Sequence, residues 1–300
     1  MSRARRSRRI ESRVHEMAAI WTAVGSGLRD AWHGLADVLL PQTCITCGLW
    51  IPAGTGLTCE SCAQEIATLR QASYCPRCGR TMAVPAIHGK SCARCIHEPF
   101  WNIAGVARIG AYQGVLRPLI TQLKYRGRER NAVFAAELLA AAMQRAGWAA
   151  DIAGLVPVPM SWLRRVQRPC DHAALLATAL GKQLGLRVMP VVRRLKHRPS
   201  QTNLASRQSR FANVKDCFGP KRFGARSVGG KTICIVDNLI TSGATVCELS
   251  KVLRRAGAKK IYAAVIARAV LLGDPDKPQP DRPIAEASVE ADLPNQGVDV

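Results

Sequence analysis

The sequence has no long apolar run. A membrane-spanning helix needs about 18 to 20 apolar residues in succession, and the longest uncharged candidate, residues 17–28, has twelve and includes Gly25 and Gly27. Five arginines before residue 10 imitate the start of a signal peptide, but His15 and Glu16 border the apolar part and no small-residue cleavage site follows. We therefore expect a cytoplasmic chain without stable membrane insertion.

Acidic residues are scarce as well, with 21 Asp and Glu against 43 Lys and Arg and a net charge of +22. Seven of the acids and only two of the bases follow residue 273, so residues 1–273 carry about +27. A body this basic attracts polyanions such as nucleic acids, phosphorylated metabolites or an acidic membrane surface. Aromatic residues make up only 5% of the chain, which leaves few platforms for stacked bases and disfavours nucleic-acid binding as the sole role.

Cysteine, by contrast, is abundant and regularly placed. Eight of the twelve cysteines form four C-x-x-C pairs: Cys44/Cys47, Cys59/Cys62, Cys75/Cys78 and Cys92/Cys95. The gaps between pairs are 11, 12 and 13 residues. A C-x-x-C turn presents two thiolates to one metal ion, and Zn²⁺ takes four in a tetrahedron, so the pattern predicts two structural zinc sites.

Sequential pairing of the knuckles is the first expectation, and interleaved pairing fits the spacing nearly as well. Gly48 and Gly79 follow their knuckles where a positive φ is commonly needed. His88 and His97 are alternative ligands, although eight cysteines already suffice for two sites. A disulfide framework is disfavoured because no export signal is present, and a site of four cysteines leaves no open position for catalysis.

The remaining pattern predicts an α/β fold with a parallel sheet. We expect strands at residues 103–112, 155–158, 232–236 and 261–267, and helices at residues 115–123, 132–146, 173–184 and from the turn after residue 240 to residue 255. A strand, a helix and a strand in succession imply a right-handed crossover between parallel strands. The basic stretches 161–168 and 197–215 are interpreted as a turn and a long loop.

Four regions follow from this pattern. Residues 1–40 form a basic tail and an amphipathic helix, residues 41–100 a double zinc ribbon, residues 101–273 the α/β domain, and residues 274–300 an acidic, proline-bearing tail expected to be disordered.

The stretch CIVDNLITSGATV, residues 234–246, has the layout of a phosphate site. An apolar strand leads into Asp237 and Asn238, a small hydroxyl-rich turn follows, and a helix begins behind it. The residues predicted to cradle a phosphate are Thr241, Ser242, Gly243, Ala244 and Thr245. Gly243 lets the backbone approach closely, the hydroxyls add donors, and the positive helix end favours a dianion.

This stretch resembles the phosphoribosyl pyrophosphate (PRPP) signature of type I phosphoribosyltransferases. Three further blocks narrow the resemblance to the ComF family of competence-associated, phosphoribosyltransferase-like proteins: YQGVLRPLITQLKYRGRER at 112–130, LVPVPMSWLRR at 155–165 and PSQTNLASRQSRFANV at 199–214. A cysteine-knuckle ribbon precedes them, as in that family. The resemblance covers roughly residues 35–270.

The resemblance implies a zinc ribbon followed by a type I phosphoribosyltransferase domain that uses PRPP with Mg²⁺. Asp237 and Asn238 would orient the ribose hydroxyls and are the candidate catalytic residues. Arg164, Arg165 and Arg168 are the candidates for the pyrophosphate. A mobile lid over the site would carry Lys196, Arg207 or Arg210.

Two departures stand out. Asn238 occupies the place of a second aspartate, and RPCDH at residues 168–172 replaces R-G-F-N-Q. Losing the charge from a hydrogen bond costs about 1.5 to 3 kcal/mol, or roughly 10- to 150-fold in affinity. Two functions therefore remain: a phosphoribosyltransferase of reduced activity, or an accessory protein of DNA uptake that binds single-stranded DNA. Other DNA-uptake proteins are candidate partners in either case.

Overall fold

The computed structural model describes residues 42–52, 54–82, 92, 95, 102–126, 129–167, 170–196, 207–222 and 224–270. The predicted N-terminal helix and the acidic tail lie outside these residues, so both stay predictions. The chain divides into two compact units. The smaller runs up to Cys44 and resumes at Gly48–Cys59, and the larger comprises Ile45–Cys47 and the chain from Glu60 onward.

The smaller unit contains a short antiparallel pair, β1 (Gln42–Thr43) and β2 (Trp50–Ile51). The chain turns between these strands through the first cysteine knuckle. The amide of Gly48 donates to the carbonyl of Cys44 (2.9 Å), and the amide of Cys44 donates to the carbonyl of Leu49 (2.7 Å). Gly48 has a φ of 78°, as its place after the knuckle predicts.

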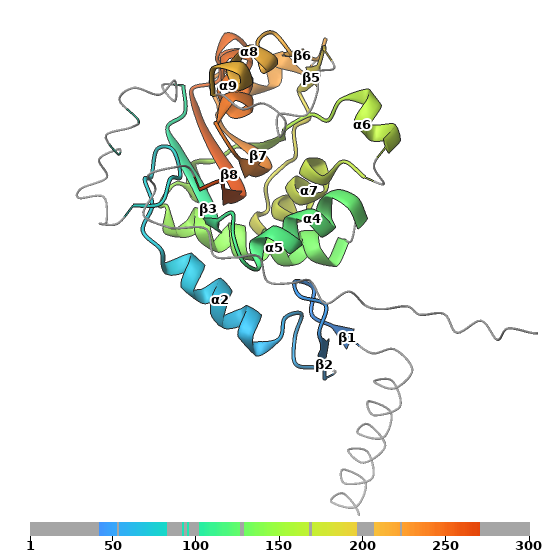
Figure 1. Ribbon diagram of the computed structural model, residues 1–300. Coiled ribbons are helices and arrows are strands. Elements are labelled where there is room, and N and C mark those ends of the chain that lie inside the picture. Colours follow the sequence, from blue (N-terminus) through green and yellow to red (C-terminus); the bar gives the residue numbers. More distant parts are fainter. Residues whose placement is uncertain are drawn as a thin grey trace, which may run out of the picture. The chain divides into compact units, whose positions relative to one another are not determined.

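The larger unit is built on a parallel sheet of four strands (Figure 1). Its strands are β3 (Gly105–Ala111), β4 (Gly154–Pro157), β7 (Thr232–Ile240) and β8 (Lys260–Arg268), in the order β3-β8-β7-β4. All three pairings are parallel. The sheet confirms the predicted α/β class, and its continuous apolar strands are typical of a sheet covered on both faces.

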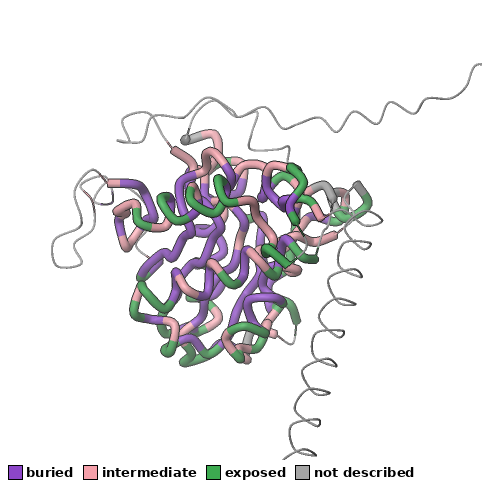
Figure 2. Tube along the Cα trace, turned by 90° about the horizontal axis from the view of Figure 1, so that it is seen from below, coloured by how far each residue is buried: buried purple, intermediate pink, exposed green. Residues whose placement is uncertain are grey.

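Helices cover the two faces of this sheet. The helices α5 (Glu129–Arg145) and α7 (His172–Leu184) pack against each other and contact the four strands. The opposite face carries α9 (Ala244–Arg255), whose Leu249 and Leu253 belong to one buried cluster with Ile233 and Ile235 of β7. Figure 2 shows the buried segments in the middle of this unit and the exposed residues toward its outside.

Shorter elements complete the larger unit. They are α2 (Glu60–Gln71), α4 (Leu116–Arg126), the 3-10 turns η2 (Ala149–Asp151) and η4 (Ala225–Val228), α6 (Trp162–Gln167), α8 (Arg207–Val214), and the antiparallel pair β5 (Val192–Arg194) and β6 (Phe218–Pro220). No helix in the described part of the chain combines the length and the apolar character that a bilayer crossing requires.

Two stretches interpreted as irregular contain helices. Most of the predicted basic turn 161–168 is α6, and the second half of the predicted loop 197–215 is α8. The loop prediction was wrong for residues 207–214 because two apolar side chains are enough to anchor them. Val214 is buried, and Phe211 packs against the cluster that holds α9. Residues 197–206 are outside the described part.

Candidate anion-binding site and metal centres

The paired polar residues Asp237 and Asn238 lie inside β7, not beyond its end. The sequence predicts that the strand stops at residue 236, but pairing with β8 continues until Ile240 lies opposite Arg268. Because side chains alternate along a strand, Asp237 and Asn238 point to opposite faces of the sheet. Asp237 is partly exposed, whereas Asn238 is 1% exposed. The two residues are therefore not equivalent.

The predicted phosphate loop follows directly from β7. A pocket of about 230 Å³ of empty space, partly open to solvent, is lined by Asp237, Leu239, Ile240, Thr241, Gly243, Ala244, Thr245 and Val246. Four of the five predicted cradle residues are among these. The fifth, Ser242, is 3% exposed, and its hydroxyl faces the amide of Ala244 at 3.4 Å.

The backbone of this loop is arranged to receive an anion. Gly243 is the N-cap of α9 with a φ of 84°, a conformation that favours glycine. Among the described residues, no hydrogen-bond partner is seen for the amide N–H groups of Ser242 and Gly243. The positive end of the α9 dipole lies at the same place. Amides without partners at the N-terminus of a helix are an arrangement in which proteins commonly bind phosphate groups.

Burial raises the pKa of the Asp237 carboxyl to about 6. The hydrogen bond from the Asn238 amide (2.8 Å) and the positive charges of Lys124 and Arg194 oppose this rise, while the carboxylate of Asp171 adds to it. At pH 7 the Asp237 carboxylate is therefore mostly ionised and can accept hydrogen bonds from hydroxyl groups. These charged groups come from α4, from the N-cap of α7 and from β5.

The side-chain amide of Asn238 is buried and makes no hydrogen bond to the described residues. Neither its nitrogen nor its oxygen has a hydrogen-bond partner among the described residues. A buried amide without partners costs about 1 to 3 kcal/mol, and such groups concentrate where a ligand or an ion completes the site. Burial of this residue could not be deduced from the sequence, where Asn238 follows Asp237 at the end of an apolar run.

The predicted pyrophosphate arginines lie on or next to α6. Arg165 is 63% exposed in its side chain and forms an ion pair with Asp171 at 3.5 Å. Asp171 in turn caps α7 by accepting from the amide of Ala174 (3.2 Å). The side chain of Arg164 and the whole of Arg168 lie outside the described part. Since Asp171 also acts on Asp237, the junction of α6 and α7 lies within electrostatic reach of the pocket.

The candidate lid residues are only partly described. Lys196 is exposed after β5, and its carbonyl accepts from the guanidinium of Arg194 (3.2 Å). Arg210 lies half-buried on α8, while the side chain of Arg207 is outside the described part. Whether any of them closes over a ligand stays a prediction.

Arg268, at the end of β8, is a residue of this site that the sequence did not reveal. It is 1% exposed, and its guanidinium donates to the carbonyl oxygen of Thr241, the first loop residue, at 2.6 Å. A lone arginine after an apolar strand gives no signal of burial. Arg268 ends the second strand of a strand–helix–strand unit, where it lies opposite Ile240, the residue before the loop. This position in the unit is the signal from which its place in the site could have been predicted.

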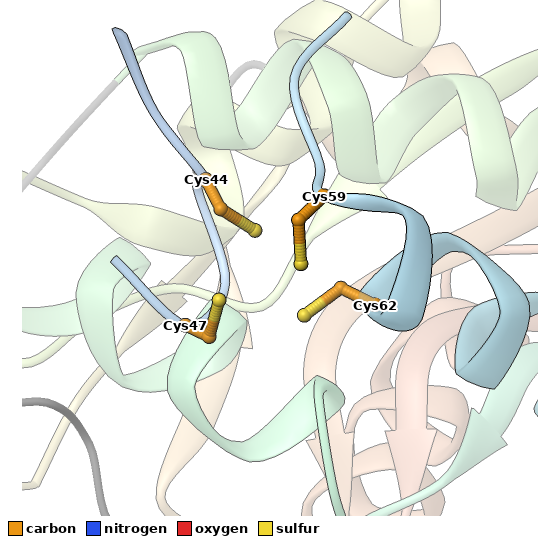
Figure 3. A group of neighbouring side chains, drawn as sticks. All are labelled: Cys44, Cys47, Cys59 and Cys62. Atoms are coloured by element: carbon orange, nitrogen blue, oxygen red, sulfur yellow. The ribbon is translucent and has the colours of Figure 1, made fainter. Parts of the chain in front are cut away.

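The eight knuckle cysteines form two groups, each drawn from consecutive pairs: Cys44, Cys47, Cys59 and Cys62, and Cys75, Cys78, Cys92 and Cys95. Within each group the sulfur atoms lie within 4.8 Å of one another. Figure 3 shows the four sulfur atoms of the first group facing a common centre. This arrangement confirms sequential pairing, and the interleaved alternative is wrong.

The second group has the dimensions of a zinc site. The distance between sulfur atoms is 3.7 Å for Cys75 and Cys95, 3.7 Å for Cys78 and Cys92, and 3.6 Å for Cys92 and Cys95. A tetrahedron with Zn–S bonds of about 2.3 Å has edges of about 3.8 Å. The four thiols therefore fit Zn²⁺ with little rearrangement.

Three thiols of this group shift one another's pKa values. Hydrogen bonds from Cys78 and Cys95 lower the pKa of Cys75, while the bonds to Cys75 raise the pKa of Cys95 and bring that of Cys78 to about 12. A metal ion binds cysteine in its thiolate form.

The second group is also part of the domain core. Cys75, Cys78 and Cys95 belong to the buried cluster that contains Ile235 of β7. The amide of Val106 in β3 donates to the carbonyl of Pro76 within the knuckle (2.8 Å). The predicted boundary between ribbon and domain at residue 100 stays a prediction, but this knuckle is packed on the sheet.

Comparison with known proteins agrees with both parts of this architecture. Residues 35–96 match the model of a double zinc ribbon domain, and residues 169–296 match that of a phosphoribosyl transferase domain. Over 231 residues the chain is 30% identical to competence protein F of Haemophilus influenzae, covering 75% of this chain and 96% of that relative. The chain belongs to the ComF family.

Other relatives of this ComF-family chain carry a different name. The DNA utilization protein YhgH of Escherichia coli K12 is 28% identical over 235 residues, with 76% of this chain and 98% of the relative covered. The protein of the same name from Salmonella typhimurium is 28% identical over 237 residues, with the same coverage. The predicted family and fold class are confirmed.

Proposed function

We propose that this ComF-family chain binds phosphoribosyl pyrophosphate in the pocket at the end of β7. The observation that carries the proposal is the loop from Thr241 to Thr245 at the N-terminus of α9, where the amides of Ser242 and Gly243 show no partner among the described residues and the ionised Asp237 lies beside them. The phosphoribosyl transferase domain match supports the same ligand class. The 5-phosphate would accept from the loop amides, and the ribose would lie against Asp237.

Transfer of the phosphoribosyl group is the reaction we propose for this site. Breaking the bond between C1 and pyrophosphate develops positive charge on the ribose, so the chain must orient the sugar and neutralise the leaving group. Asp237 would hold a ribose hydroxyl and stabilise the developing charge. The side-chain amide of Asn238, on the other face of β7, has no partner among the described residues and offers two donors and one acceptor oxygen.

The leaving pyrophosphate needs basic groups at the mouth of the pocket. We assign this role to Arg164, Arg165 and Arg168, with Lys196, Arg207 or Arg210 closing over the ligand. The acceptor would supply its own nucleophile, since no nucleophile and general-base pair lies in the described part of the pocket. Because Arg165 is paired with Asp171, it would have to exchange that carboxylate for the ligand.

Mg²⁺ fits the residues of this site. A carboxylate is a hard ligand of the kind Mg²⁺ takes together with substrate phosphates. Asp237, which lines the pocket, would hold it, and when bound the ion would supply neutralisation of the pyrophosphate charge. We assign the orientation of the ribose to Asp237 whether or not Mg²⁺ is bound.

The test is calorimetric titration of the zinc-loaded full chain with PRPP and Mg²⁺, beside Asp237→Ala and Asn238→Asp. We expect binding by the unaltered chain, a loss of at least about 10-fold in Asp237→Ala, and a gain of about 10-fold in Asn238→Asp from the added charge. Equal affinity of the unaltered chain and Asp237→Ala would contradict the assignment of the pocket.

A second candidate function is binding of single-stranded DNA. The observation that favours it is the surface of α6, where Trp162 is 71% exposed and Val166, one turn on, is 79% exposed, with the exposed Arg165 between them. An exposed aromatic ring beside a guanidinium can stack a base and contact a phosphate. The net charge of +22 and the names of the DNA utilization relatives support a place in DNA uptake or handling.

Two measurements distinguish DNA binding from PRPP binding: the salt dependence of the affinity and the effect of replacing each of two exposed tryptophans. Affinity for an oligothymidylate should fall steeply with salt, and Trp162→Ala should weaken it by about 5-fold or more. Trp50→Ala removes a comparably exposed tryptophan, 57% exposed on β2, and should leave the affinity unchanged. Equal losses in the two variants, or none in Trp162→Ala, would exclude α6 as the stacking surface.

A further inference from the structure

Arg268 ends β8 at the edge of the sheet where the pocket lies. It is opposite Ile240, the last residue of β7, and the backbone continues this pairing, since the amide of Ala269 donates to the carbonyl of Ile240 (2.8 Å). Residues opposite one another in parallel strands share a face, so Arg268 and Asn238 lie on the same face of the sheet. The side chain of Arg268 therefore begins next to the residue that precedes the phosphate loop, on the face of the sheet that carries Asn238.

The contact that Arg268 makes fixes one peptide unit of this loop. Its guanidinium donates to the carbonyl oxygen of Thr241 at 2.6 Å, a short distance typical of a charge-assisted bond. In a planar trans peptide the carbonyl and the following N–H point in opposite directions. The amide N–H of Ser242 must therefore point away from Arg268, and no partner for it is seen among the described residues.

The charge of Arg268 adds to this geometry. A guanidinium stays protonated at every pH a folded protein tolerates, and this one is only 1% exposed, so water screens it weakly. It is hydrogen-bonded directly to the loop that we assign to the 5-phosphate. A buried cation at this position favours a dianion on the other side of the loop.

We propose that Arg268 is a positioning residue of the phosphate loop: it holds the peptide between Thr241 and Ser242 with its N–H toward the 5-phosphate. Arg268 does not touch the ligand in this arrangement. It acts through the backbone, and its buried charge strengthens the attraction for the phosphate. The inference rests on the proposed binding of a phosphoribosyl ligand and adds the group that organises the site.

Arg108 provides the comparison that separates this role from a structural one. It lies in β3 of the same sheet and is also 1% exposed. Its guanidinium donates to the hydroxyl of Thr81 (2.7 Å) and lies 5.1 Å from the ring centre of Tyr74, so it supports the segment around the second cysteine knuckle. Replacing either arginine removes one buried cation from the sheet, but only Arg268 contacts the loop.

The experiment compares the zinc-loaded full chain with Arg268→Met, Arg268→Lys and Arg108→Met. The ligands are PRPP with Mg²⁺, ribose 5-phosphate, and pyrophosphate with Mg²⁺, and thermal unfolding reports on the fold of each variant. We expect Arg268→Met to weaken PRPP and ribose 5-phosphate by the same factor, about 10- to 100-fold. Pyrophosphate binding should not change, because it makes no use of the loop. Arg108→Met should bind both sugar phosphates as the unaltered chain does.

Each outcome decides one question. If Arg268→Met is folded and binds ribose 5-phosphate as tightly as the unaltered chain, the positioning role is wrong. If it does not fold, Arg268→Lys decides, because lysine keeps the charge but lacks the planar fork: weaker binding supports the role and unchanged binding overturns it. An unaltered chain that binds neither sugar phosphate contradicts the proposed function itself, which is a different result from either of these.

Discussion

At the residue scale, a substitution of Asn238 should change the free energy of unfolding and the affinity for PRPP in opposite directions. Its amide is buried without partners in the described chain, so Asn238→Leu should keep the packing and remove the unsatisfied group. Replacing such a group by an apolar side chain of similar shape is neutral or stabilising. We expect the free energy of unfolding to rise by up to about 1 kcal/mol, and PRPP affinity to fall at least 10-fold.

Urea unfolding and calorimetry on the same preparations check both expectations. A variant that loses stability and keeps its affinity would mean that the amide has a structural partner and no role toward the ligand.

Asp237 should leave a mark on the dependence of stability on pH. Its pKa of about 6 in the folded chain lies above the ordinary 3.8, so between these values the folded state holds a proton that the unfolded state has lost. Stability from this group is therefore present below pH 4 and declines as the pH rises to 6, by at most about 3 kcal/mol.

Asp237→Asn removes this dependence. The difference in unfolding free energy between Asp237→Asn and the unaltered chain should grow in favour of the variant from pH 4 to pH 6.5 and then level off. Urea unfolding at four pH values measures it, and a difference that is flat across this range would show that the carboxyl is not raised.

Sequence reasoning at this scale located the loop but not its support. Thr241 to Thr245 were predicted from their residue types and their place between a strand and a helix, because those are local properties. The burial of Asn238 and the inward turn of Arg268 depend on which strand lies beside β7 and on how far the pairing continues. Neither is encoded within a few residues of either side chain.

At the scale of elements, the second cysteine knuckle should behave as part of the sheet. Cys78 belongs to the second group of four cysteines, which shares a core with β7, so Cys78→Ser should release one of two zinc ions. We expect a loss of more than about 3 kcal/mol in unfolding free energy, since the binding energy of a structural zinc ion is folding energy.

Cys234→Ala is the matched control. Cys234 is fully buried in β7 but belongs to neither group of four, so this variant should keep two zinc ions per chain. Metal analysis and thermal unfolding check the pair. A Cys78→Ser variant with two zinc ions, or with the stability of the unaltered chain, would contradict the assignment of the second group.

The elements themselves show which patterns carry information. The buried strands β7 and β8 and the helix between them follow from apolar runs and the crossover rule. The helix ends at Arg255, as predicted, and Gly257 with a φ of 90° follows it. The helix α8 was missed because a sequence window with Phe211 and Val214 as its anchors is too polar to indicate burial. Its stability comes from packing on α9, which is a tertiary effect.

At the scale of the whole molecule, the chain combines a large positive charge and two groups of four cysteines with the pocket that we propose for a phosphorylated sugar. The net charge of +22 acts over distances comparable to the Debye length, about 8 to 10 Å at ordinary ionic strength, whereas the loop acts by contact. Binding to DNA should therefore depend strongly on salt and binding to PRPP only weakly. The fold class and the cysteine groups were predictable because they depend on periodicity and spacing over the full chain.

The most direct test of the account is a crystal structure of the zinc-loaded chain with PRPP and Mg²⁺. The account predicts the 5-phosphate against the backbone amides of Ser242 to Thr245, a ribose hydroxyl on Asp237, and the bond from Arg268 to the Thr241 carbonyl intact. A 5-phosphate bound elsewhere, with the loop from Thr241 to Thr245 empty, would contradict it.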